Sequence, residues 1–137
     1  MKKLFCNHTV DTRTSLGLLM MRLVMGLAMI QHGFPKIQNP MAWAGEGFPP
    51  FLQLLAAVSE FGGGIALILG LLVPLASFGL FCTMVVAVHM HAIVKGDPFV
   101  GYNGSYELAL IYLCFAILMI LAGPGKYSLD QKLFKSN

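Results

Sequence analysis

Ionisable side chains interrupt the apolar stretches of this sequence, and several are of the types that exchange protons. Histidine and carboxylate groups can be tuned by burial to change charge near neutral pH. Because a charge inside an apolar span is costly, it normally faces the protein interior and has a partner. The candidate substrate-binding residues, for which no catalytic role is assigned, are Arg22, His32, Lys36, Glu60, His89 and Glu107.

The elements that must position these side chains are membrane-spanning helices. The chain has 137 residues, of which 57% are hydrophobic and only 11% charged, far from the usual quarter charged of a soluble domain. Apolar runs at roughly 15–35, 50–73, 74–94 and 105–122 are each about long enough to cross a bilayer, and they leave no room for a soluble catalytic domain. The runs are continuous rather than alternating, which disfavours a β-barrel. We therefore predict an all-α, integral membrane four-helix bundle.

Basic residues at the two ends of the chain indicate its orientation. Lys2, Lys3 and Arg13 precede the first span, and Lys126, Lys132 and Lys135 follow the last. With an even number of spans, the positive-inside rule places both termini in the cytoplasm. The predicted segments are a tail at 1–14 without a cleavable signal, a membrane domain at 15–123, and a C-terminal segment at 124–137 with a short interfacial helix. The net charge of +3 is explained by these flanks, so the expected partner is the lipid bilayer rather than nucleic acid.

The cysteines and the His-x-His pair argue against a metal site. Cys6, Cys82 and Cys114 have no CxxC spacing, and a cysteine within an apolar span is usually a small hydrophobe. His89 and His91 point about 160° apart on a regular helix, so they cannot both face one site. One should face the bundle and the other the outer headgroups, and the pattern favours His89 for the interior.

Helical periodicity predicts which polar groups meet. Arg22, His32 and Lys36 share one arc of the first span, whereas Gln31 lies opposite. Glu60 lies on a face of small residues that lets another helix approach closely. Counting depth at about 1.5 Å per residue places Arg22 near Glu60 in the inner half, so we expect these two to pair. The groups expected in an outer pocket are His32, Lys36, His89 and Glu107.

Several local features of the loops and helix ends are also predicted. The loop after the first span carries Trp43 as an interfacial aromatic residue. Pro50 can begin the second helix, and a turn at Val73-Pro74 separates the second and third. Ser105 and Ser128 are candidate N-caps. Gly123-Pro124-Gly125 should stop the fourth helix.

Three functions are compatible with these polar groups. A buried arginine and glutamate pair could serve only to assemble helices, as in a scaffold or assembly factor for a partner oxidoreductase. Alternatively, a polar pocket open toward the outer leaflet could bind a quinone or related small molecule, with His32 and His89 exchanging protons as electrons move. Haem ligation by two histidines has only their similar depth in its favour.

Four motifs in the same order and spacing resemble the DoxX family of small bacterial membrane proteins. They are MRLVMGLAMIQHGFPKI, SEFGGGIALILGLLVPLA, VHMHA and AGPGKYSLD, which cover most of the chain after the N-terminal tail. The matching positions are Arg22, His32, Gly33, Lys36, Glu60, Gly63, Gly70 and the Gly123 to Gly125 turn. The family includes proteins linked to terminal quinol oxidase and to thiosulfate:quinone oxidoreductase. The resemblance implies a multi-pass inner-membrane protein connected to quinone or sulfur redox chemistry, with a partner redox protein.

Overall fold

The computed structural model describes residues 10–134, and these residues form helices and connecting turns without a β-strand. This confirms the predicted all-α class. Expectations that involve Lys2, Lys3, Cys6 and Lys135 lie outside the described residues. The helices are α2 (Thr12–Gln38), α3 (Pro50–Leu69), α4 (Val73–His89), η1 (Met90–Val94), which continues α4 as a π-helix, α5 (Glu107–Ala122) and α6 (Leu129–Phe134).

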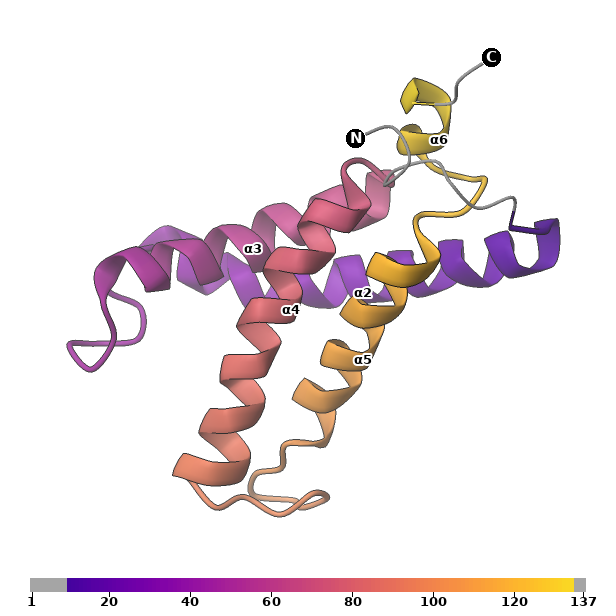
Figure 1. The fold of residues 1–137 in the computed structure, drawn as a ribbon. Coiled ribbons are helices and arrows are strands. Elements are labelled where there is room, and N and C mark those ends of the chain that lie inside the picture. The colour runs from indigo at the N-terminus through magenta and orange to yellow at the C-terminus, as the bar shows by residue number, and fades with distance from the viewer. Residues whose placement is uncertain (1–9, 135–137) are drawn as a thin grey trace.

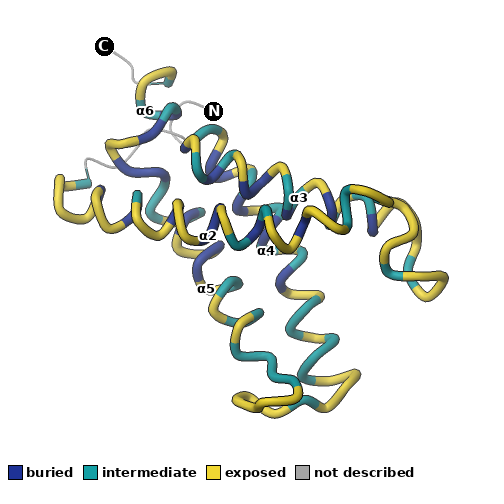
Figure 2. Tube along the Cα trace, turned by 180° about the vertical axis from the view of Figure 1, so that it is seen from behind, coloured by how far each residue is buried: buried dark blue, intermediate teal, exposed yellow. Residues whose placement is uncertain are grey.

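The four long helices form two antiparallel hairpins that meet at one end and diverge at the other (Figure 1). α2 packs along α3, α4 packs along α5, and α3 contacts α4. The turn between α3 and α4 lies at the end where the hairpins meet, together with α6. Buried residues gather where the hairpins cross, whereas the far ends of α4 and α5 are only partly covered (Figure 2).

Three of the four long helices match the thickness of a bilayer, and α5 is shorter. α2, α3 and the continuous α4–η1 helix are each long and apolar enough to span a membrane. α5 is apolar but has 16 residues, about 24 Å at 1.5 Å per residue. Large apolar side chains on the outer surface of α2, such as Met20, Val24 and Leu27, are more than half exposed. Such a surface is typical of a lipid-facing helix rather than of a water-soluble protein.

Glycines set the close contact between α2 and α3. A Cβ atom added at Gly33 would lie 2.4 Å from the backbone nitrogen of Phe61, and one at Gly64 would lie 2.7 Å from the carbonyl oxygen of Gly26. Neither neighbour is a flexible side chain that could move aside. The small-residue face predicted around Glu60 is thus confirmed, and it determines how α3 is aligned along α2.

This alignment contradicts the predicted pairing of Arg22 with Glu60. Arg22 Nη1 lies beside Gly70, at the C-terminal end of α3, whereas Glu60 lies beside Lys36 near the C-terminal end of α2. The two side chains are separated by about three helical turns along the hairpin. The prediction is wrong because it assumes that the ends of the two helices lie at the same depth, whereas Arg22, ten residues into α2, lies level with the C-terminal end of α3.

Arg22 instead holds the segment that follows α5. Its Nη1 donates to the carbonyl oxygen of Pro124 at 2.7 Å, and its Nη2 donates to that of Tyr127 at 2.5 Å. Arg22 is fully buried, and the nearby Asp130 supplies an opposite charge. We call residues 124–130 the C-terminal clasp, because they join the end of α5 to both hairpins.

Asp130 connects the C-terminal clasp to the start of α4. Its carboxylate accepts hydrogen bonds from the backbone N–H groups of Leu72 at 2.6 Å and Val73 at 2.9 Å. These are donors that the first turn of α4 leaves without partners. Leu72 has a φ of 50°, an uncommon value for a non-glycine residue, and the Asp130 bond helps to hold it. The turn therefore lies at Gly70–Leu72, slightly before the predicted Val73-Pro74.

The other predicted helix ends are mostly confirmed. α3 begins at Pro50, and α5 is followed by Gly123 with a φ of 73°. Ser128 Oγ accepts the N–H of Gln131 at 3.2 Å, as expected of an N-cap. Ser105 was the wrong choice, because the N-cap of α5 is Tyr106 and makes no side-chain cap bond.

Thiol labelling tests the predicted orientation, including whether the short α5 crosses the membrane. On a background without the three native cysteines, Asn103→Cys is expected to react with a membrane-impermeant maleimide in intact cells. Lys132→Cys should react only after permeabilisation, because the segments that carry the two residues are separated by α5. Both positions are exposed. The opposite pattern would overturn the orientation, and labelling of both from one side would show that α5 does not span.

Candidate functional site

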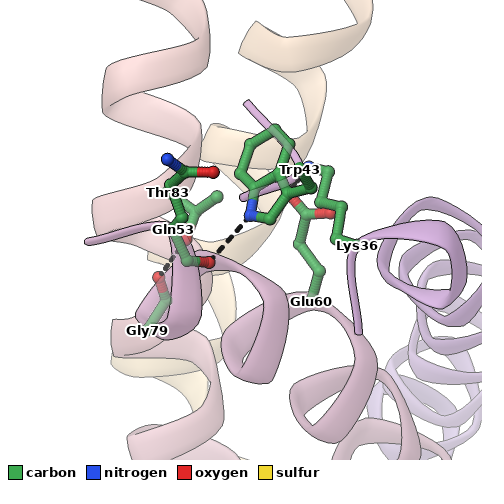
Figure 3. Close-up of polar contacts among 6 residues, drawn as sticks. All are labelled: Lys36, Trp43, Gln53, Glu60, Gly79 and Thr83. Atoms are coloured by element: carbon green, nitrogen blue, oxygen red, sulfur yellow. Dashed lines mark hydrogen bonds and ion pairs between the residues drawn. The ribbon is translucent and has the colours of Figure 1, made fainter. Parts of the chain in front are cut away.

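Gln53 organises the loop that joins α2 to α3, at the end of this hairpin farthest from the C-terminal clasp. Its side-chain oxygen accepts the N–H of Ala44 at 2.7 Å, and its Nε2 donates to the carbonyl oxygens of Gly45 and Phe48, both at 2.9 Å. The backbone carbonyl oxygen of Gln53 accepts a hydrogen bond from the indole N–H of Trp43 at 2.9 Å (Figure 3). Gln53 is buried in the first turn of α3. One amide side chain therefore supplies hydrogen bonds to three backbone groups of a loop that has no regular secondary structure.

The loop places Trp43 over an ion pair. Lys36 Nζ lies 2.6 Å from Glu60 Oε1 and 4.4 Å from the centroid of the Trp43 ring. An ammonium group above an indole face is attracted by the ring's quadrupole. Trp43 was predicted to be an interfacial belt residue, but the structure gives it specific contacts with Gln53 and Lys36. Figure 3 shows the indole next to the Lys36 and Glu60 side chains.

The ion pair lies at a cleft between α3 and α4. The cleft has a volume of about 950 Å³, within the range of about 300–1,000 Å³ typical of small-molecule sites. Most of its lining residues are apolar or small. They are left uncovered because the two hairpins diverge. The polar lining residues are Lys36, Gln53, Ser59, Glu60, Thr83 and His91.

Glu60 carries an unusual free acceptor. Its side chain is 3% exposed, and while Oε1 is bonded to Lys36, Oε2 has no hydrogen-bond partner. Among the described residues, the other buried side-chain atoms in this condition are Arg22 Nε and Ser77 Oγ, which belong to residues outside the cleft lining. An unpaired buried acceptor is costly, so Glu60 Oε2 marks a place where a donor would be stabilising.

Four of the six predicted site residues lie away from this cleft. Arg22 is buried in contact with the C-terminal clasp. His32 is exposed and packs edge-on against Tyr112, with ring centroids 5.9 Å apart. Glu107 is in the first turn of α5, on the other hairpin, where the helix dipole favours its charge. His89, the fourth, is also absent from the cleft lining, so of the predicted set the structure brings together only Lys36 and Glu60.

The two histidines of the His-x-His pair have the reverse of the predicted placement. His89 is exposed, and His91 lines the cleft. His91 Nδ1 lies 2.7 Å from Asp97 Oδ2, and His91 belongs to the π-helical segment η1. The wider π-helical turn changes the direction of side chains, so a regular periodicity of 100° per residue does not apply here.

Sequence reasoning missed Gln53, Thr83 and His91 as cleft residues. Gln53 had a detectable signal, since it is a polar residue in the apolar run FLQLLAAV and such residues normally have partners. Thr83 gave no such signal, because a threonine in an apolar helix commonly satisfies its own hydroxyl within that helix. Here the hydroxyl donates to the carbonyl of Gly79 at 3.0 Å. Within residues 10–134 no three His, Cys, Asp or Glu side chains are grouped as metal ligands.

These features define a small helical membrane protein with a mostly apolar cleft and a partly buried ion pair at it. The DoxX family model matches residues 17–94, which include both the ion pair and the cleft. The chain belongs to the DoxX family. The resemblance of its motifs is thus confirmed.

Relatives of similar length support this assignment. A Haemophilus influenzae protein named "Uncharacterized protein" is 35% identical over 84% of this chain and 89% of its own. The Escherichia coli "Inner membrane protein YqjF" is 30% identical over 87% of this chain and 93% of its own. The Bacillus subtilis "Putative oxidoreductase CatD" is 27% identical over 88% of this chain and 89% of its own. No solved structure matches this chain.

Proposed function

We propose that this DoxX-family membrane protein binds a quinone or a related lipophilic small molecule in the cleft between α3 and α4. The observation that carries the proposal is the Lys36–Glu60 ion pair, with Oε2 of Glu60 unpaired, at a mostly apolar cleft. A lipophilic ring would fill the apolar part, while Lys36 could donate to a carbonyl oxygen of the ligand and Glu60 could accept from a hydroxyl group. Sites of this kind combine an apolar cavity with a few placed polar groups.

The proposal extends to a membrane redox system with a partner redox protein. One relative carries the word oxidoreductase in its name, and another is named an inner membrane protein. We place this chain in the bacterial inner membrane for the same reason. Lipophilic carriers reach such a site from within the bilayer, which suits a cleft between two membrane helices.

Fluorescence of Trp43 provides a direct test. It is the chain's single tryptophan, and it is part of the cleft lining. A short-chain ubiquinone should quench its emission saturably in detergent. Lys36→Met should raise the dissociation constant at least about tenfold, because the Lys36 ammonium can donate to a quinone carbonyl and a hydrogen bond from a charged group contributes about 1.5–3 kcal/mol. Glu107→Gln, on the other hairpin, should leave the dissociation constant unchanged.

A displaced tryptophan controls for quinone that dissolves in the micelle. In the double variant Trp43→Phe, Gln31→Trp, the indole lies on the exposed side of α2 and should show only weak, non-saturable quenching. Equal quenching at both positions would argue against a bound quinone. If the protein also copurified consistently with another polypeptide, that result would favour the alternative role of a scaffold or assembly factor.

A further inference from the structure

The ion pair restricts the charge of any molecule that occupies the cleft. Lys36 and Glu60 compensate each other at 2.6 Å, and the described lining contains no other acidic, lysine or arginine side chain. A charged ligand such as a sulfur oxyanion would bring an uncompensated charge into a mostly apolar space, at a high desolvation cost. The lining therefore favours a neutral ligand.

The free atom restricts the hydrogen-bonding character of that ligand. An ionised carboxylate oxygen can only accept hydrogen bonds, and Glu60 Oε2 is buried without a donor. A ligand carbonyl or ether oxygen near Oε2 would place lone pairs against lone pairs. A hydroxyl group can donate to Oε2 and also accept from Lys36 Nζ, which is bonded to the other oxygen of the same carboxylate.

The aromatic side chains of the cleft indicate that the apolar part of the ligand is a flat ring. Trp43, Phe48 and Phe78 all line the cleft, and aromatic rings pack well against one another in offset or edge-on arrangements. A flat ring with a hydroxyl substituent satisfies both the apolar walls and the free acceptor. An oxidised quinone has the same ring but carries only acceptors.

We propose that the cleft selects a neutral aromatic hydroxyl compound, so that it binds the reduced quinol in preference to the oxidised quinone, with Glu60 Oε2 as the selecting atom. This inference rests on the proposed function, which requires only that the cleft binds ligands of this class. It adds a preference between two redox states of one molecule. The preference needs no electron transfer to the protein, because both forms are supplied as ligands.

Competition against quinone quenching of Trp43 measures the preference on the unmodified protein. The displacing compounds are a short-chain ubiquinol, kept anaerobic, and the dimethyl ether of the same quinol, which retains the ring but cannot donate. The quinol should displace the quinone at a concentration at least about tenfold lower than the ether, because only the quinol satisfies Glu60 Oε2. Its dissociation constant should also be below that of the quinone.

Glu60→Gln provides the matched variant, because a side-chain amide offers both a donor and an acceptor. The preference of quinol over ether should fall to less than about threefold in this variant, while Glu107→Gln should retain it. If Glu60→Gln does not fold, the comparison of quinol with ether on the unmodified protein still decides.

The outcomes separate this inference from the proposed function. Equal binding of quinol, quinone and ether would overturn the selection by Glu60 and leave the cleft as a binding site. Tighter binding of the quinone would overturn the selection as well. If no compound altered Trp43 fluorescence saturably, the proposed function would fail and the selection with it.

Discussion

Replacing Asp130 with alanine is expected to lower the free energy of unfolding in detergent by about 2–5 kcal/mol, because one buried and one partly buried backbone donor lose their acceptor. These donors are the N–H groups of Leu72 and Val73 at the start of α4. The variant also removes the opposite charge near the buried Arg22, and an uncompensated buried charge is strongly destabilising. Thermal unfolding followed by circular dichroism would measure the effect.

Glu46→Ala is the control for this prediction. Glu46 is exposed in the loop between α2 and α3, and surface substitutions of this kind usually change stability by less than about 0.5 kcal/mol. If Asp130→Ala unfolded at the same temperature as Glu46→Ala, the C-terminal clasp would have no role in holding the two hairpins together. The clasp would then be a peripheral segment.

The second large effect is expected from a substitution at Gly64 of α3. Gly64→Ala should destabilise the protein by about 1–3 kcal/mol, the usual cost of overpacking. Its Cβ would lie 2.7 Å from the carbonyl oxygen of Gly26 and 2.8 Å from the backbone nitrogen of Ile30. Neither atom can move without separating α2 from α3. The same thermal unfolding experiment applies.

Gly62→Ala provides a matched control in the same helix. A Cβ atom there would meet only Val58, at 3.9 Å, so the higher helix propensity of alanine should stabilise the protein by up to about 1 kcal/mol. The two substitutions are chemically identical and two residues apart. A similar response to both would show that the packing of α2 on α3 does not depend on the absence of a side chain at Gly64.

These structural contacts bear on the site as well as on stability. The close approach at Gly33 and Phe61 places Lys36 beside Glu60. The C-terminal clasp holds the hairpins together at one end, and the cleft lies where α3 and α4 separate. Residues far from the cleft, such as Arg22 in contact with the C-terminal clasp, thus help to determine its shape.

The predicted fold and several elements of the site follow from the sequence. The apolar runs predict spanning helices because their length matches the bilayer. The small residues near Glu60 predict a close helix contact, and the buried arc of α2 contains Arg22, Met25 and Gly26 as expected. The cost of a buried charge also predicts that Arg22 and Glu60 each have a partner. The motif resemblance correctly identified the DoxX family.

Which partner each charge has was decided only by the tertiary structure. Periodicity assigns a residue to a face of its own helix, but it does not determine how far one helix is shifted along its neighbour. That shift is set by the contacts of Gly33 and Gly64, and it places Glu60 beside Lys36 rather than Arg22. Likewise, the acceptors for Arg22 are backbone carbonyls of the C-terminal clasp, and backbone groups leave no signal in the sequence. A sequence can therefore show that a buried charge must be compensated, whereas the neighbour that compensates it depends on how the helices pack.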